Sequence, residues 1–134
     1  MTKQSRYSYS ETVERLSKAI SDAGIKIFDT IDQAAAAAQV GMTLRPTALI
    51  IFGNPRAGTP FMQAFPLMAL ELPLKTIVWE ENGTVSVAYT PFTELAARYH
   101  VTGMDEAAAK LDVILEKLVS SVAAESTPAV TSPV

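Results

Sequence analysis

The chain has 134 residues, 49% of them hydrophobic, and a formal net charge of −3 at pH 7. This length predicts one domain that buries roughly two-thirds of its unfolded surface. The 11 Lys and Arg residues are scattered and form no basic stripe, which argues against nucleic-acid binding. The absence of cysteine excludes disulfides, thiolate metal sites and cysteine nucleophiles.

The N-terminal residues are polar from the start and contain no apolar signal core. No apolar run in the chain reaches the roughly 18 residues that a membrane-spanning helix requires. We therefore expect a soluble, cytoplasmic protein that binds neither a membrane nor nucleic acid. Residues 1–125 are expected to form the domain, and the Pro-, Ser- and Thr-rich residues 126–134 are expected to be a disordered tail.

A short strand and an amphipathic helix open the chain. Residues 4–9 alternate weakly, as a strand with one solvated face does. Ser8, with Glu11 three residues later, has the spacing of a capping box, although Ser10 offers a second capping hydroxyl. The helix should continue to about Ala23 and end at Gly24.

Two further strands are predicted before the middle of the chain. The first covers residues 25–31, and Asp32 after it can cap a short helix through the alanine run at 34–38, which Gly41 ends. Residues 47–52 form the next strand. Because this strand is apolar on both faces, it should be an interior strand of the sheet.

The segment GNPRAGTP, from Gly53 to Pro60, is rich in residues with restricted or special backbone angles, and we predict a rigid loop there. A helix should follow from about Pro60, near its first position, to Leu70. Pro66 inside that segment predicts a kink or two short helical turns.

The remaining elements are a hairpin and two helices. Asn82-Gly83 is a strong turn signal between strands at 74–80 and 85–89, and Val85, Val87 and Tyr89 should share one face. Helices are predicted at 91–99 and from Asp105 to about residue 124, the latter opened by a capping box of Thr102 and Asp105. Adjacent strands with helices between and after them favour an α+β fold with a mainly antiparallel sheet packed on helices.

A set of short motifs in this order resembles the domain of unknown function 302 family over residues 8–118. The motifs are Glu11-Thr12-Val13, Arg15-Leu16, Ile31-Asp32, Leu44-Arg45-Pro46, Phe52-Gly53-Asn54-Pro55, Gly58-Thr59-Pro60, Met62, Leu72-Pro73-Leu74-Lys75, Val78-Trp79 and Ala88-Tyr89.

The resemblance implies a TBP-like fold of β-α-β(4)-α type, here with extra short helices, and association into homodimers. It implies no established activity. Members commonly carry a histidine after the Ile-Asp pair, where this chain has Gln33, so metal or proton chemistry at that position is not expected here. The single histidine, His100, lies at a predicted helix C-terminus, which explains it as a capping residue.

The loop beside the third predicted strand is the main candidate for a ligand site. Main-chain N–H groups at a helix N-terminus attract anions, and arginines can add charge-assisted hydrogen bonds to them. The loop matches no Walker or dinucleotide motif, however, and its prolines lack N–H donors. The candidate ligand contacts are Arg45, Asn54, Arg56, Gly58 and Thr59, with Met62, Phe65 and Trp79 as apolar walls.

Three hypotheses for function follow. The preferred one is a dimeric, non-catalytic module that binds a small molecule, with an anionic ligand among the candidates, and with no cofactor and no metal. The second is an enzyme in which Asp32 or Glu80 serves as general base next to the loop. The third is a structural or protein-interaction role for the Met- and Phe-rich segment 61–70.

A pocket beside Gly53–Thr59 without a carboxylate would favour the first hypothesis over the second. Trp79 and Tyr89, on the two strands of the predicted hairpin, are expected to form a stabilising cross-strand aromatic pair.

Overall fold

A computed structural model describes residues 1–124 of the chain. The predicted tail at 126–134 lies outside the described residues. The elements, in chain order, are β1 (Thr2–Gln4), α1 (Tyr9–Asp22), β2 (Lys26–Asp32), α2 (Gln33–Gln39), β3 (Thr47–Gly53), α3 (Pro55–Ala64), the 3-10 helix η1 (Pro66–Leu70), β4 (Leu74–Glu81), β5 (Thr84–Ala88), α4 (Phe92–Arg98) and α5 (Asp105–Ser120).

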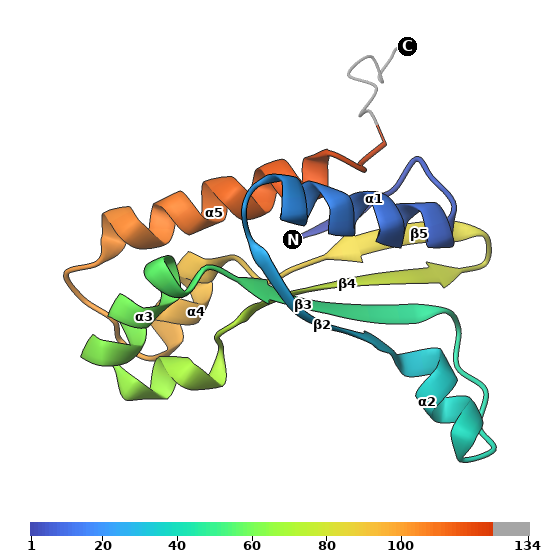
Figure 1. Ribbon diagram of the computed structural model, residues 1–134, viewed down its shortest axis with the longest axis horizontal. Coiled ribbons are helices and arrows are strands. Elements are labelled where there is room, and N and C mark those ends of the chain that lie inside the picture. Colours follow the sequence, from blue (N-terminus) through green and yellow to red (C-terminus); the bar gives the residue numbers. More distant parts are fainter. Residues whose placement is uncertain (125–134) are drawn as a thin grey trace, which may run out of the picture.

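The strands form one antiparallel sheet in the order β1-β5-β4-β3-β2. Helices α1 and α5 lie along one face of this sheet (Figure 1). At one end of the sheet lie α3, η1 and α4, whereas α2 stands at the opposite end. The predicted α+β fold of β-α-β(4)-α type with extra short helices is therefore confirmed.

Residues of β3 alternate between the two faces of the sheet. Ala48, Ile50 and Phe52 are buried against the helices. They join the core with Leu16 and Ile20 of α1, Val78 of β4, Val87 of β5, and Leu115, Leu118 and Val119 of α5. The two helices thus cover this face because each turns an apolar stripe toward it.

The opposite face of the sheet, called the open face below, is apolar at its centre. The register places Leu49 of β3 between Ile31 and Ile77, and Thr47 beside Trp79. Ile51, at the next outward position of β3, lies on the same face. Within residues 1–124, no helix lies along this face (Figure 1).

Two predicted helix caps are confirmed. The Ser8 hydroxyl accepts a hydrogen bond from the Glu11 N–H at 3.2 Å, and α1 begins at Tyr9. The Asp32 carboxylate accepts one from the Ala35 N–H at 2.9 Å and begins α2. The predicted interruption at Pro66 is also present, because α3 ends at Ala64 and η1 is a separate turn of helix.

Three local predictions are wrong. The first strand ends at Gln4, because the buried Ser5 hydroxyl turns inward and lies 2.6 Å from that of Thr12. No Thr102–Asp105 capping box forms, since the N-cap of α5 is Met104, which makes no side-chain capping bond. Trp79 pairs with Ser86 and faces outward, whereas Tyr89 is buried against the helices. The two aromatic rings therefore lie on opposite faces of the sheet and form no cross-strand pair.

The N-terminal edge of the sheet is tied to α5 through Glu116. The Lys3 ammonium donates to Glu116 Oε1, and the Tyr89 hydroxyl donates to Oε2 at 3.2 Å. The hydrogen bond from Lys3 is the main reason that the pKa of Glu116 lies below its ordinary value. Burial, followed by the nearby Glu116 carboxylate, raises the pKa of Tyr89 to about 12.

Because the folded-state pKa of Glu116 is lowered, its carboxylate stabilises the fold above the unfolded pKa, and this stabilisation is lost as the pH falls through the folded pKa. We expect Glu116→Gln to reduce the free energy of unfolding at pH 7, with a difference from the native chain that shrinks toward pH 3. Urea denaturation at both pH values measures this. An equal loss at the two pH values would contradict the electrostatic role of Glu116.

Candidate functional site

Strand β3 runs directly into α3 through Asn54 and Pro55. The Asn54 side chain accepts a hydrogen bond from the Arg56 N–H at 3.0 Å, and Pro55 occupies the start of the helix, where a missing N–H costs nothing. The predicted loop from Gly53 to Pro60 is therefore mostly helix. The prediction was wrong because Asn54-Pro55 is itself a cap followed by a first helical residue, a role the sequence analysis gave to Pro60.

The N–H groups at the start of α3 are engaged within the chain. Those of Ala57 and Gly58 donate to the Asn54 carbonyl at 2.9 and 3.0 Å. The Arg56 N–H donates to the Asn54 side chain, and Pro55 has no N–H. An anion at this helix terminus would have to displace these hydrogen bonds. The free N–H groups that a phosphate site needs are therefore not available at the start of α3.

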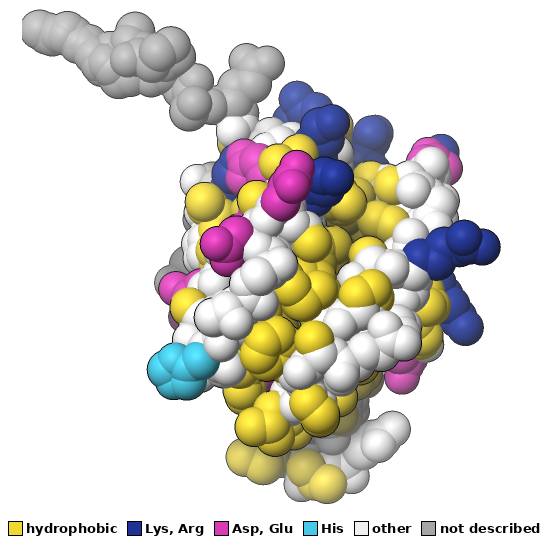
Figure 2. All heavy atoms as spheres, turned by 90° about the vertical axis from the view of Figure 1, so that its left-hand side faces the viewer, with side chains coloured by type: hydrophobic (Ala, Val, Ile, Leu, Met, Phe, Trp, Pro, Cys, Tyr) yellow, Lys and Arg dark blue, Asp and Glu magenta, His cyan; other side chains and the backbone are white. Residues whose placement is uncertain are grey.

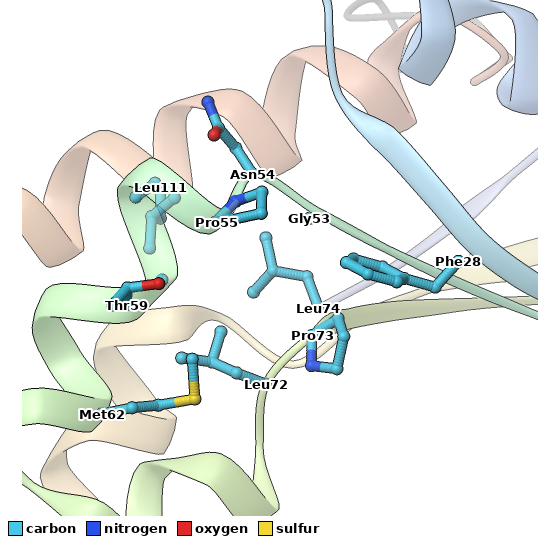
Figure 3. Close-up of a pocket in the computed structure, with 12 residues that line it drawn as sticks. Phe28, Gly53, Asn54, Pro55, Thr59, Met62, Leu72, Pro73, Leu74 and Leu111 are labelled. Carbon is cyan, nitrogen blue, oxygen red and sulfur yellow. The ribbon is translucent and has the colours of Figure 1, made fainter.

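A pocket of about 210 Å³ opens beside this junction, at the end of the sheet. Most of the residues that line it are apolar, and they come from five elements and the η1–β4 connection (Figure 3). The lining residues are Phe28, Gly53, Asn54, Pro55, Ala57, Gly58, Thr59, Met62, Leu72, Pro73, Leu74 and Leu111.

The polar groups of the pocket are few. Figure 3 shows the Asn54 amide directed away from the leucines and the Thr59 hydroxyl on the pocket side of α3. None of the lining residues is a carboxylate or a cation. The pocket can therefore hold an uncharged, mainly apolar group and can offer it a hydrogen bond through Thr59.

Two glycines keep this space open. A methyl group at Gly58 would lie 3.6 Å from Cδ1 of Leu72, and one at Gly53 would lie 3.5 Å from Cβ of Pro73. Both are ordinary contact distances, so the backbone does not require glycine there, but a longer side chain at either position would enter the pocket. Phe28 reaches the mouth of the pocket at a bulge of β2, where the register with β3 shifts between Ile27 and Asp29.

The eight predicted ligand contacts are not gathered at one site. Asn54, Gly58, Thr59 and Met62 line the apolar pocket.

The other four predicted contacts lie elsewhere. Arg45 and Trp79 line a separate depression of about 410 Å³ on the open face, where Arg45 also pairs with Glu81 at 3.3 Å. Phe65 lines a third hollow beside Tyr99. Arg56 is exposed on α3 and belongs to none of these three linings. The two arginines therefore lie outside the apolar pocket.

Neither candidate general base lies in the pocket. Asp32 caps α2, and Glu80 sits near the hairpin end of β4, hydrogen-bonded through its N–H to the Pro46 carbonyl. Among residues 1–124, no group of three or more His, Asp or Glu side chains is placed to hold a metal ion.

Five of the twelve residues that line the pocket lie outside residues 53–62, where the predicted loop and Met62 lie. Leu72, Pro73 and Leu74 approach α3 only after the chain has turned through η1, and Phe28 is positioned by a bulge that leaves no mark in the sequence. Leu111 of α5 belongs to the hydrophobic core and also lines the pocket. The one usable signal was the Leu72-Pro73-Leu74 run, which leads into β4.

The family model described as "Domain of unknown function DUF302" matches residues 1–118. The chain belongs to the DUF302 family. A crystal structure of an uncharacterized conserved DUF302 protein from Bacillus stearothermophilus superimposes on this domain with a TM-score of 0.84. The alignment covers 91% of this chain and 96% of that chain at 21% sequence identity, so it shows a shared fold.

Curated relatives of this DUF302 domain carry the name of a fluoride-specific ion channel. FluC 1 of Brucella suis and FluC 1 of Brucella abortus are each 38% identical to it over 100 residues. The match covers 74% of this chain but only 39% and 37% of the two relatives. In the part of the chain that the structure describes, no helix has the length and apolar character needed to cross a membrane.

Gly58→Ala should stabilise the domain, because glycine inside a helix costs roughly 0.5–1 kcal/mol relative to alanine and the added methyl group meets only the end of the Leu72 side chain. We expect an increase of that size in the free energy of unfolding, measured by urea denaturation. The comparison variant is Gly83→Ala, whose positive φ of 81° in the hairpin turn predicts a loss. A loss in Gly58→Ala as well would show that α3 cannot accept a side chain there.

Proposed function

We propose that this DUF302 domain binds a small, uncharged, mainly apolar molecule in the pocket beside α3 and does not transform it. The observation that supports this most directly is the pocket itself, which forms at the predicted Gly53–Thr59 segment and has no carboxylate in its lining. A binding module needs a shaped apolar cavity with few polar groups, whereas an enzyme needs a reactive group facing the ligand.

The size of the pocket limits the ligand. An engineered protein cavity of about 150 Å³ binds benzene. A pocket of about 210 Å³ suits a slightly larger molecule, such as a bicyclic aromatic compound or a short branched chain. A single hydroxyl or N–H on the ligand would pair with Thr59, at the side of the pocket that α3 forms.

An uncharged ligand fits better than the anionic one considered from the sequence. The main-chain donors of α3 are engaged, and Arg45 and Arg56 do not line the pocket. Transfer of an anion into an apolar cavity without paired donors is costly. We further propose that the domain works in the cytoplasm as a homodimer, as the family resemblance implies, with the open face of the sheet available for association.

The test is two-dimensional NMR of the 15N-labelled full chain, titrated with indole and, separately, with inorganic phosphate. We expect indole to shift the amide signals of Gly53, Gly58 and Leu74, and phosphate to leave them unchanged. Gly58→Leu should abolish the indole shifts, because its side chain would occupy the pocket beside Leu72.

The matched control is Gln63→Leu, which adds the same side chain to an exposed position of α3 outside the pocket lining. It should bind indole as the native chain does. Phosphate shifts centred on Arg56 and Gly58 would instead support an anion site at the start of α3. Native mass spectrometry of the purified protein, before and after denaturation, would identify a copurified ligand by its mass.

A second candidate function is an accessory domain of a fluoride channel, which the match to part of the two Brucella relatives favours. We expect deletion of the matched region from the Brucella suis relative to change the rate of fluoride efflux from vesicles without abolishing it, because most of that protein's length lies outside the match. Equal efflux from the full and shortened channels would argue against a regulatory role.

A further inference from the structure

The open face has the composition of a buried surface. Its centre holds Ile31, Leu49, Ile51, Ile77 and Trp79, contributed by the three neighbouring strands β2, β3 and β4. A sheet that faces water on one side normally alternates apolar residues with polar ones. Strand β3 does not alternate in this way, since three of its outward positions are Thr47, Leu49 and Ile51. A second layer of protein on this face would explain its composition.

The region next to the open face is largely exposed to solvent. Helix α2 has no buried residue, and the connection from α2 to β3 exposes Val40 by 73% and Met42 by 66%. Leu44 continues this apolar region into the depression lined by Ile77 and Trp79, and Gln33 of α2 lines the same depression. Figure 1 shows α2 extending from the end of the sheet on the side away from α1 and α5. A partner on the open face would therefore also meet this helix.

The charges on the open face are arranged symmetrically about β3. Ile51 of β3 pairs with Asp29 of β2 on one side and with Lys75 of β4 on the other. Both charged residues are exposed, and neither forms an ion pair within residues 1–124. A two-fold axis along β3 would place β4 of one copy over β2 of the other. Lys75 would then face Asp29 of the second copy, twice in the dimer, because every contact in a two-fold interface occurs in both directions.

The edges of the sheet suit association less well than its face. Edge strand β2 contains a bulge at Phe28 and carries Lys26, Asp29 and Asp32, features that discourage pairing with another strand. The other edge, β1, is three residues long. A dimer that extends the sheet edge to edge would also leave the apolar centre of the open face in water.

We propose that two copies of this chain pack face to face through the open faces of their sheets, with the two-fold axis along β3 and with Lys75 of each copy opposite Asp29 of the other. Ile51, Leu49 and Ile77 form the apolar centre of this interface, and Trp79 lies toward its α2 end. The inference rests on the homodimer included in the proposed function and is independent of the ligand pocket.

The experiment is analytical ultracentrifugation of the full chain over a range of concentrations, combined with fluorescence of Trp79, the single tryptophan. We expect a reversible dimer, with Trp79 emission moving to longer wavelength as dilution separates the copies and exposes the ring. Lys75→Asp should raise the dimer dissociation constant by more than about tenfold, because it brings like charges together at two symmetric places. Asp29→Lys should do the same.

The double variant Asp29→Lys with Lys75→Asp restores opposite charges across the axis and should recover the dimer. Lys110→Asp is the matched control, because it makes the same change at an exposed position of α5, on the other face of the sheet. Circular dichroism checks that each variant is folded. A native chain that stays monomeric at every concentration would overturn both the dimer and this interface. A native dimer that neither single variant weakens would overturn the interface alone.

Discussion

Burial of alternate β3 residues against α1 and α5 is the interaction on which the rest of this domain depends. Ile50 and Phe52 are almost fully buried there, together with Leu16 and Ile20 of α1 and Leu115 of α5. Because successive residues of a strand point to opposite faces, fixing these two side chains inward also fixes Leu49 and Ile51 outward. A slip of one residue in the register would exchange the two sets. The covered core and the apolar open face are therefore consequences of a single register.

The same strand sets the position of the candidate site. With Phe52 held in the core, Asn54 emerges at the end of the sheet, where it can cap α3. Helix α3 is then anchored by Phe61, whose ring meets that of Phe92 edge to face at a centroid distance of 4.8 Å. The pocket is the space left between this anchored helix and the Leu72–Leu74 segment, with Gly53 and Gly58 contributing no side chain to fill it. Figure 2 views this end of the molecule, over which hydrophobic side chains gather.

Large hydrophobic side chains are exposed on this end of the molecule. Leu67 and Leu70 of η1 are exposed by 63% and 67%, close along the chain to the Leu72–Leu74 wall of the pocket. The residues of segment 61–70 therefore lie in three different environments. Phe61 and Met68 belong to the core, Met62 lines the pocket, and the two leucines of η1 are exposed at the surface. Neighbouring residues of this segment lie in different environments because the chain changes direction at Phe65, between α3 and η1.

The fold class, most elements, two helix caps and the hairpin at Asn82-Gly83 could be predicted from the sequence, because each depends on residues close together in the chain. The sequence also located the segment that borders the pocket, through the glycines and prolines between Gly53 and Pro60. Which of the predicted ligand contacts lie together could not be predicted, because it depends on how distant segments pack. Arg45 and Trp79 separate from Thr59 because they lie toward the α2 end of the sheet, whereas α3 begins at the other end. The outward direction of Trp79 and the approach of Phe28 and Leu72–Leu74 depend on strand register, a bulge and the turn through η1, which arise from contacts between residues distant in the chain.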